Sequence, residues 1–509
     1  MRVTSEQGNI FSEPKVLENF LLGCQETAIA KDSTMIVSIS QEIPLVDPLA
    51  VMAAIAPSDR LQFYWESAGD AIAAIDAATS IKITQADRFR KAQEFIHTCL
   101  ANTISIGDLD LRFAGPHFFC SFTFFGQQSE SVFPAATVFL PRLQVACSAN
   151  HCILVTNLAI GPLADIKSIC SKLWWDWHKI SLCNNNGFHK AAGNKLPTGQ
   201  LSDYCVPPLR LAILGDTEDK FKQTVGEALE LIRSERLSKI VIAHGISIQA
   251  KVPFREREAL HNLRQLHGDC HIFMVSNGEG KSFIGATPER LMRIRCVPDS
   301  GMSALCPPSS DPSAPEGYSF GTENQQLFTE ALAGSAPRGK TRREDADFAN
   351  SLLASEKERR EHQFVIDYIK GCLSKLDLKP EILPMPKLRK LANIQHLWTP
   401  IEAKVPPGVH PLSILAALHP TPAVAGTPRE IACQEIPRYE SFDRGLYAAP
   451  LGWVDGRGNS EFVVGIRSAL IEGDRATVYA GAGIVAGSDP EKELAEIQLK
   501  FQALLQALV

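Results

Sequence analysis

The strongest constraint on the fold is a set of β-branched, alternating segments that are separated by segments of helical period. The run Ser238–Gln249 reads SKIVIAHGISIQ, which is typical of a strand. It follows Phe221–Arg236, whose apolar residues recur at helical spacing, and further strand-like runs lie at Ile272–Ser276 and Phe462–Leu470. The helical segments are segregated from the strands instead of following each one. The sequence therefore predicts an α+β fold and not a regular βαβ winding.

The length of the chain and its loop-like segments predict how this fold is divided. At 509 residues the chain is long enough for more than one structural unit. The first 205 residues carry few chemical signals, and we expect 1–205 to be an N-terminal half that completes the sheets of a catalytic unit at 206–509. Two irregular segments, Cys183–Gln200 and Pro298–Gly321, are rich in Gly, Asn, Pro or Ser, so we interpret them as a linker and a surface insertion.

Charge and cysteine usage exclude several classes of function. Lys and Arg number 51 against 57 Asp and Glu, which gives a net charge of −6, and no basic run stands out. Nucleic acid and anionic membrane surfaces are therefore disfavoured as partners. The thirteen cysteines are scattered without a CxxC pair, and no apolar run reaches the length of a membrane span. These features predict a cytoplasmic protein in a reducing compartment.

Two predicted helices carry acidic pairs beside their apolar faces. Asp347–Leu376 is predicted as one long helix that contains Glu358 and Glu361, and the last helix, from Asp489 onward, contains Glu493 and Glu496. Each pair has i, i+3 spacing, so its two carboxylates share a helix face. Acids beside an apolar stripe must be paired or bound to a cation, because an uncompensated buried carboxylate is costly. The pattern leaves two alternatives open, namely salt bridges to nearby arginines or a Mg²⁺ site.

Cationic and glycine signals point to a small anion as ligand. Lys500 lies one helical turn beyond Glu496, and Arg467 stands among β-branched residues in VVGIRSAL, where it needs a carboxylate or phosphate partner. Small residues at Leu332–Ser335 and Gly481–Gly483 would let backbone N–H groups approach an anion. No Walker A motif and no Rossmann fingerprint is present, so a nucleotide is not the expected anion.

At this point the sequence resembles the chorismate-utilising enzymes over roughly Leu209 to Val509, and within them the isochorismate synthases. The resemblance depends on many segments in the family order: SKIVIAH (238–244), FIGATPERL (283–291), TEALAGSAPRG (329–339), LLASEKERREH (352–362), NIQHLWTPIEA (393–403), LHPTPAVAGTP (418–428), ESFDRGLYAAPLGW (440–453), EFVVGIRSAL (461–470) and YAGAGIVAGSDPEKELAEIQLK (479–500). It implies a fold of large antiparallel sheets packed in layers and flanked by helices.

The resemblance also implies a role for each site residue. Glu361 and Glu496 would bind Mg²⁺, supported by Glu358 and Glu493, and the metal would hold the ring carboxylate of chorismate. Further residues would bind or border the substrate: Gly334, Ser335, His396, Tyr447, Arg467, Gly481 and Lys500. Lys239 would be the general base and Glu289 the general acid for adding water at C2 and expelling the C4 hydroxyl. Water is a poor nucleophile and hydroxide a poor leaving group, so both groups are needed.

A few positions separate the subfamilies. Aminodeoxychorismate synthases typically have a lysine at the position of Ala333, and anthranilate synthases usually have glutamine at that of Lys239 and a PAG-type sequence at His419–Pro422. Both ammonia-using activities are therefore disfavoured. A salicylate synthase and a non-catalytic chorismate-binding protein stay open as alternatives. We expect an isomerase that acts as a monomer, and the long N-terminal half favours a menaquinone- or phylloquinone-type enzyme by analogy.

Overall fold

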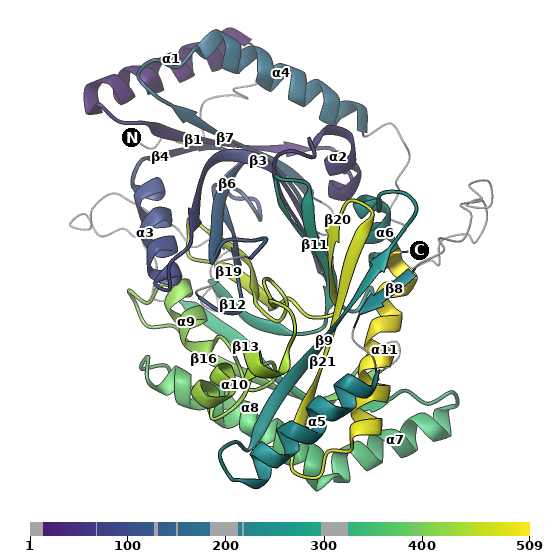
Figure 1. Cartoon of the computed structure of the whole chain (residues 1–509). Helices are drawn as coiled ribbons and strands as arrows, with labels where there is room; N and C mark the ends of the chain where they lie inside the picture. Colours follow the sequence, from purple (N-terminus) through teal and green to yellow (C-terminus); the bar gives the residue numbers. More distant parts are fainter. Residues whose placement is uncertain are drawn as a thin grey trace.

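The computed structural model describes residues 14–67, 69–126, 131–148, 151–183, 212–215, 218–296, 324–391 and 394–508. Strands and helices form separate groups, which confirms the predicted α+β fold (Figure 1). Within these residues every strand pair is antiparallel except β1 (Met35–Ile43) with β4 (Thr103–Gly107), which is parallel. The predicted insertion, the boundary at 205/206 and the predicted linker apart from its first residue, Cys183, which ends a helix, lie outside the described residues, so the division into two parts stays a prediction.

The long strand β6 (Ala136–Ser148) is the point from which two sheet arms diverge. It pairs with β7 (His151–Ile160), β3 (Asp70–Ile83) and β5 (His117–Phe122). β7 in turn pairs with β1. Strand β6 is almost entirely buried, as expected where sheets meet from several directions.

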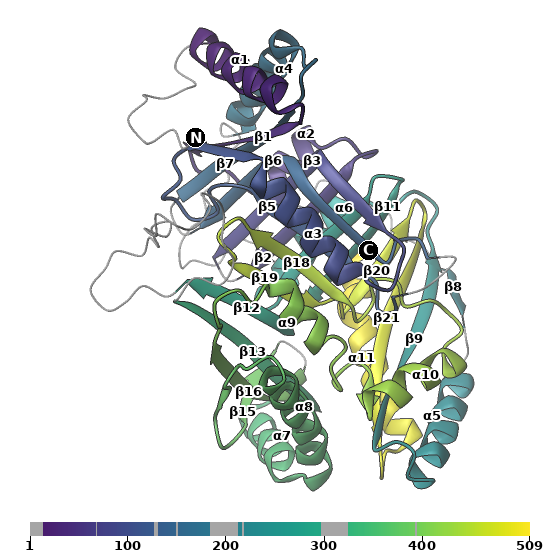
Figure 2. The same ribbon diagram turned by 90° about the vertical axis from the view of Figure 1, so that its left-hand side faces the viewer.

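From β3, one arm continues through the following strands in order: β2 (Leu61–Ser67), β10 (His271–Asn277), β11 (Lys281–Thr287), β20 (Ser468–Glu472), β21 (Arg475–Val485) and β9 (Lys239–Gln249), with β8 (Ala212–Gly215) and β17 (Gly426–Thr427) beside β9. From β5, the other arm continues through β18 (Pro450–Asp455), β19 (Ser460–Val464), β12 (Arg290–Cys296), β13 (Gln325–Pro337) and β16 (Ile394–Lys404), with β14 (Glu381–Ile382) and β15 (Lys387–Lys390) beside β16. The two arms are seen apart from one another in Figure 2.

Each arm carries a helix that later supplies acidic side chains. α8 (Glu356–Ser374) packs against β13, and α11 (Pro490–Leu508) packs against β21, α5 (Glu218–Arg233) and α6 (Glu256–Leu266). The remaining helices are α1 (Pro14–Lys31), α2 (Pro48–Ile55), α3 (Arg88–Ala101), α4 (Ile166–Cys183), α7 (Arg342–Ala354), α9 (Pro411–Leu418) and α10 (Arg429–Tyr439). A small separate core lies between α1, α4 and the β1–β7 pair. None of the helices in these ranges is long and apolar enough to cross a membrane.

Two helix predictions need correction. The predicted helix Asp347–Leu376 is two helices, because Ser355 is in an extended conformation and its side chain accepts a hydrogen bond from Glu358 N, which starts α8 afresh. The apolar residues of Ser80–Leu100 lie at helical spacing and predict a helix over that range, but the helix begins only at Arg88, since β3 continues to Ile83 through pairing with β6. A local hydrogen bond decides the first boundary, whereas pairing with a strand distant in the sequence decides the second.

The structure also contains a disulfide that the sequence does not predict. Cys147 and Cys152 are directly opposite on the β6–β7 hairpin and are joined by a disulfide. Their spacing of five residues is not a CxxC motif, so strand pairing alone brings them together.

Candidate active site

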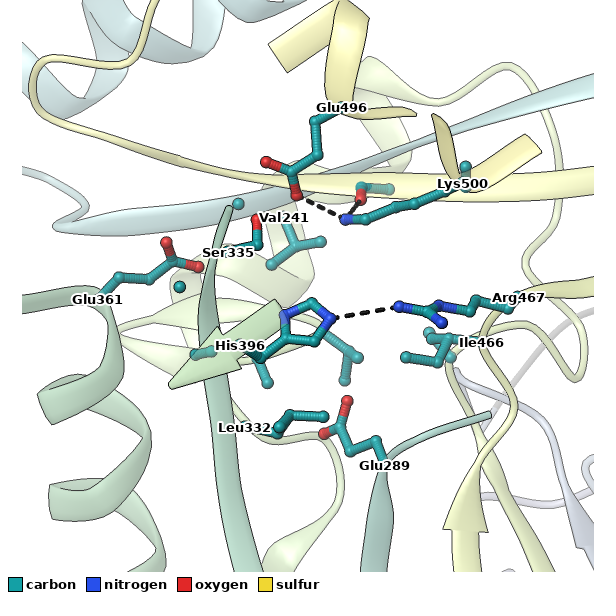
Figure 3. A pocket seen from close by; sticks show the side chains of 18 of the residues that line it. Val241, Glu289, Leu332, Ser335, Glu361, His396, Ile466, Arg467, Glu496 and Lys500 are labelled. Carbon is teal, nitrogen blue, oxygen red and sulfur yellow. Dashed lines mark hydrogen bonds and ion pairs between the residues drawn. The ribbon is translucent and has the colours of Figure 1, made fainter. Parts of the chain in front are cut away.

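A cavity between the far ends of the two arms brings the predicted site residues together. It has about 900 Å³ of empty space, including its opening to solvent. Twelve of the thirteen residues predicted for the site line it: Glu289, Gly334, Ser335, Glu358, Glu361, His396, Tyr447, Arg467, Gly481, Glu493, Glu496 and Lys500. Figure 3 shows that the side chains it labels, among them Glu361, Arg467 and Glu496, come from both arms and point into one space. The thirteenth residue, Lys239, is fully buried behind this lining.

The acidic face of the cavity is built by α8 and α11. Glu358 and Glu361 project from α8, and Glu493 and Glu496 from α11. Val365 and Ile369 continue the face of Glu361 at i+4 and i+8 and are buried, so the apolar stripe of α8 holds its acids against the sheet.

Three lysines partner these acids. Lys239 Nζ lies 2.8 Å from Glu361 Oε1, and Lys500 Nζ lies 2.7 Å from Glu496 Oε1. Lys357 Nζ lies 3.1 Å from Glu493 Oε1 and 3.6 Å from Glu358 Oε1. The alternative that these acids form salt bridges to nearby arginines is therefore wrong about the residue type, because lysines form the salt bridges.

Crowding of the carboxylates shifts their pKa values apart. Burial and the neighbouring Glu361 raise the pKa of Glu358 to about 7. Burial and Glu496 likewise raise the pKa of Glu493. Burial acts in the same direction on Glu496, but the hydrogen-bonded Lys500 outweighs it and lowers the pKa of that carboxyl. The raised pKa values of Glu358 and Glu493 reflect, besides burial, repulsion between the carboxylates, which a bound cation would relieve.

The donor set fits the coordination habits of Mg²⁺. Among the residues that the structure describes, no three His, Cys, Asp or Glu side chains converge closely enough to hold an ion by themselves. Mg²⁺ usually takes one or two carboxylates and fills its octahedron with water and an anionic substrate. Two oxygen-donating side chains, Glu361 and Glu496, on facing helices of an open cavity satisfy that requirement.

A bulge in β13 shapes the wall next to the acids. The β13–β16 register shifts between Ala333 and Ser335, and Gly334 in the bulge has φ +77°. A Cβ at Gly334 would lie 3.2 Å from the backbone oxygen of Glu358, so glycine is required for this close approach. The bulge turns the Ser335 N–H toward Glu358 Oε2, 3.0 Å away. Leu332–Ser335 thus belong to a strand, which ends at Pro337 shortly before α7.

Cationic groups form the wall that adjoins Glu496. Arg467 was predicted within a strand, but it lies between β19 and β20 at φ +49°, where the chain leaves the sheet. Its Nη2 donates to His396 Nε2 over 3.2 Å. Because a guanidinium can only donate, His396 must be neutral at Nε2. Burial and the positive charges of Arg467 and Lys500 lower the pKa of His396 to about 3, in agreement with this bonding.

Lys500 and Tyr447 complete this wall. The Lys500 ammonium also donates to Gly481 O over 2.7 Å, which fixes it at the cavity. A Cβ at Gly481 would lie 2.8 Å from the Tyr447 hydroxyl, so a glycine in β21 admits that ring. Gly481–Gly483 belong to strand β21.

Glu289 lies on the side of the cavity away from Glu496 (Figure 3). It is buried in the turn between β11 and β12. Burial and the nearby Glu330 carboxylate raise the pKa of Glu289 to about 8, although Lys239 and Lys500 act in the opposite direction. At neutral pH the Glu289 side chain is therefore protonated and can donate a proton.

Sequence reasoning missed two charged residues of this region. Lys357 lines the cavity and pairs with Glu493. It stands directly before Glu358 in the sequence, so its position beside an acidic residue was a signal that could have revealed it. Glu330 lies behind the cavity and bonds residues far away in the chain, so no local pattern reveals it.

Comparison with known proteins assigns the family. The family described as "chorismate binding enzyme" matches residues 23–297 and 316–509. The chain belongs to this family. A salicylate biosynthesis isochorismate synthase of Pseudomonas aeruginosa is 31% identical over 497 residues, which cover 96% of this chain and 94% of that protein. The isochorismate synthase MenF of Bacillus subtilis is 32% identical over 291 residues, which cover 57% of this chain and 56% of that protein.

Solved structures show that the fold is the one typical of chorismate binding enzymes. The menaquinone-specific isochorismate synthase MenF from Escherichia coli superposes with a TM-score of 0.69 at 24% identity, over 96% of this chain and all of that one. Component I of anthranilate synthase from Streptococcus pneumoniae superposes with a TM-score of 0.62 at 19% identity, over 86% of this chain and 92% of that one. The predicted layered antiparallel fold is confirmed, and since the scaffold serves different products, the site must decide the chemistry.

Proposed function

We propose that this chorismate binding enzyme is an isochorismate synthase. The observation that supports this most is the presence of two buried groups of opposite proton function at one cavity: Lys239 lies directly behind the lining and pairs with Glu361, and Glu289, whose raised pKa keeps it protonated, belongs to the lining. A hydroxyl exchange needs a proton acceptor where water attacks and a proton donor where hydroxide leaves. The names of the relatives in Pseudomonas aeruginosa and Bacillus subtilis agree with this activity.

The cationic wall suits the enolpyruvyl carboxylate of chorismate. Arg467 presents the Nη atoms of a buried guanidinium, and the Lys500 ammonium and the Tyr447 hydroxyl lie on the same wall. Charge-assisted hydrogen bonds from guanidinium to carboxylate are strong and directional. His396, which is neutral and bonded to Arg467, would orient the guanidinium and border the ring.

In the proposed reaction, two protons move and the atoms balance. Lys239 would accept a proton from a water molecule whose oxygen bonds to C2, and the ring double bonds would shift. Glu289 would donate its proton to the C4 hydroxyl, which leaves as water. The product is an isomer of the substrate, so no oxidant or reductant is needed.

Mg²⁺ would be held by Glu361 and Glu496, with Glu358 and Glu493 shaping the charge around them. When bound, it would supply positive charge for the ring carboxylate of chorismate. The Ser335 N–H, bonded to Glu358, and Gly334 would border the ring on this side.

The pathway and two alternative activities stay open to experiment. The long N-terminal half favoured a quinone-type enzyme, yet the salicylate biosynthesis relative matches the chain over nearly its whole length, so the length does not discriminate. Use in menaquinone or phylloquinone synthesis, a cytoplasmic location and a monomeric state are predictions of the sequence. A salicylate synthase and a non-catalytic chorismate-binding protein are the competing activities.

Purified protein incubated with chorismate, with and without Mg²⁺, tests the proposal when the products are separated by chromatography. Mg²⁺-dependent isochorismate is the expected product. Salicylate with pyruvate would replace the proposal by the salicylate synthase, and chorismate binding without any turnover would contradict an enzymatic role.

A further inference from the structure

Glu330 is a buried carboxylate that the proposed reaction does not use. It lies in β13, two residues before the cavity-lining Leu332, so the two side chains share one face of the strand. Leu332 and Glu289 are seen on the same side of the cavity in Figure 3. Glu330 itself does not line the cavity, which means that it can act on the substrate only through another residue.

Three donors hold the Glu330 carboxylate. Arg389 Nη1 in β15 donates to Oε1 over 2.9 Å, and Trp398 Nε1 in β16 donates to Oε2 over 2.8 Å. The backbone N–H of Arg290 donates to Oε1 over 3.1 Å. Three donors, one of them a guanidinium, stabilise a negative charge at a fixed place.

The third donor connects Glu330 to the proposed acid, because Arg290 directly follows Glu289. The backbone N–H and the backbone carbonyl of Glu289 are both hydrogen-bonded as well. Its N–H donates to Thr287 Oγ1 over 3.2 Å, and its carbonyl accepts from Val464 N over 3.1 Å. The turn that carries Glu289 is therefore fixed against the Glu330 carboxylate.

The titratable groups that face Glu289 come from three elements and from the segment before β18. Glu330 in β13 opposes its ionisation, whereas Lys239 in β9 and Lys500 in α11 favour it, and the hydroxyl of Tyr447 lies before β18. All these groups except Lys500 are buried, so their interactions are little screened by solvent. The two lysines favour the ionised form of Glu289, and among these charged groups Glu330 favours the protonated form.

We propose that Glu330 is a positioning residue which, together with Arg389 and Trp398, keeps Glu289 in its protonated, proton-donating form by a fixed negative charge. This inference rests on the proposed function, since it assigns Glu289 the role of general acid. It explains why a carboxylate is buried behind the cavity at all, where an apolar residue of similar size would avoid the cost of desolvation.

The substitution Glu330→Gln removes the charge and keeps the shape. The expected result is that the high-pH limb of isochorismate formation moves to lower pH, by about one pH unit, because Glu289 then loses its proton more easily. The double variant Glu330→Gln/Arg389→Gln also removes the unpaired cation, so we expect a shift in the same direction but smaller. The double variant serves in place of the single one if the unpaired Arg389 prevents folding.

Glu461→Gln is the matched control. Glu461 is also a buried carboxylate of this arm and is paired with the side chain of Arg290, at 3.0 Å, and not with the backbone beside Glu289. We expect its variant to lose stability without moving the pH limb. A structural role of Glu330 would instead give both variants the same behaviour.

A second readout does not depend on turnover. The carboxylic-acid C=O band of Glu289, identified by its loss in Glu289→Gln, is followed by infrared spectroscopy during a pH titration of the wild type and the Glu330 variants. A band that disappears at lower pH in the variants supports the inference. An unchanged limb and an unchanged band would overturn it while the proposed function stands, whereas wild-type protein that makes no isochorismate would overturn the proposed function itself.

Discussion

Lys239 Nζ lies 2.8 Å from Glu361 Oε1, so the proposed base and a proposed metal ligand are hydrogen-bonded to each other. The lysine is fully buried, and its pairing with Glu361 keeps it behind the lining of the cavity. An ammonium bonded to a carboxylate cannot accept a proton, and a carboxylate bonded to an ammonium is a poorer metal ligand. The two residues can therefore act together in catalysis only if the pair separates.

The first prediction separates this pair by substitution. Lys239→Met should lower isochorismate formation by about 10²- to 10⁴-fold, the usual contribution of a general base. The same variant should bind Mg²⁺ more tightly in the absence of substrate, because Glu361 loses its competing cation. Calorimetric titration with Mg²⁺ and a chromatographic activity assay measure the two effects.

Lys357→Met is the control for this experiment, since Lys357 pairs with Glu493 and not with a proposed metal ligand. It should change turnover much less than Lys239→Met. Near-normal turnover of Lys239→Met would show that the base is another group.

The second prediction concerns the pH dependence of stability. The pKa of Glu289 is about 8 in the folded protein, against 4.5 as its ordinary value, because of burial and Glu330. From about pH 5 to about pH 8 the unfolded chain has lost this proton while the folded chain retains it, so rising pH favours unfolding. Glu289→Gln does not titrate, and its melting temperature relative to the wild type should therefore rise from about pH 5 to about pH 8. A constant difference would mean that Glu289 has an ordinary pKa.

The sequence predicted the acids of the site because a carboxylate beside an apolar stripe is a local signal. Glu361 and Glu496 lie on helices whose period is visible without any partner, and the structure places both at one cavity. The same reasoning could not tell that lysines from another strand or helix would pair with these acids. Such partners, Lys239 above all, depend on which elements the fold brings together.

Backbone geometry explains why the prediction of one continuous strand through Arg467 is wrong. The sequence VVGIRSAL is β-branched before the arginine and apolar again after it, so it indicates one continuous strand. In the fold, β19 pairs with β12 and β18, while β20 pairs with β11 and β21, and the chain must change partners between them. Arg467 takes a positive φ at that change, which no local preference of an arginine would predict.

The third prediction tests the cationic wall. Arg467→Lys keeps the charge but loses the planar guanidinium and its bond to His396, so the KM for chorismate should rise about ten- to hundredfold, with a smaller change in kcat. Arg475→Lys is the control, because Arg475 is an arginine of β21 that bonds Gln249 at the exposed end of the hairpin. Steady-state kinetics of both variants decide the matter, and equal KM values would remove Arg467 from substrate binding.

The fourth prediction uses a glycine that lies against the Lys239–Glu361 pair. A Cβ at Gly483 would lie 2.6 Å from Glu361 Oε1 and 3.0 Å from Lys239 Cε, so Gly483→Ala must displace both side chains. We expect turnover to fall at least about tenfold, since a misplacement of about 1 Å in a catalytic group can cost a hundredfold.

Gly226→Ala is the control for this experiment. A Cβ at Gly226 in α5 meets nothing within 4 Å, so this variant should retain full activity and gain about 0.5–1 kcal/mol in the free energy of unfolding. Activity assays and denaturant unfolding of the two variants measure these effects. Normal turnover of Gly483→Ala would show that the position of this pair does not matter for the reaction.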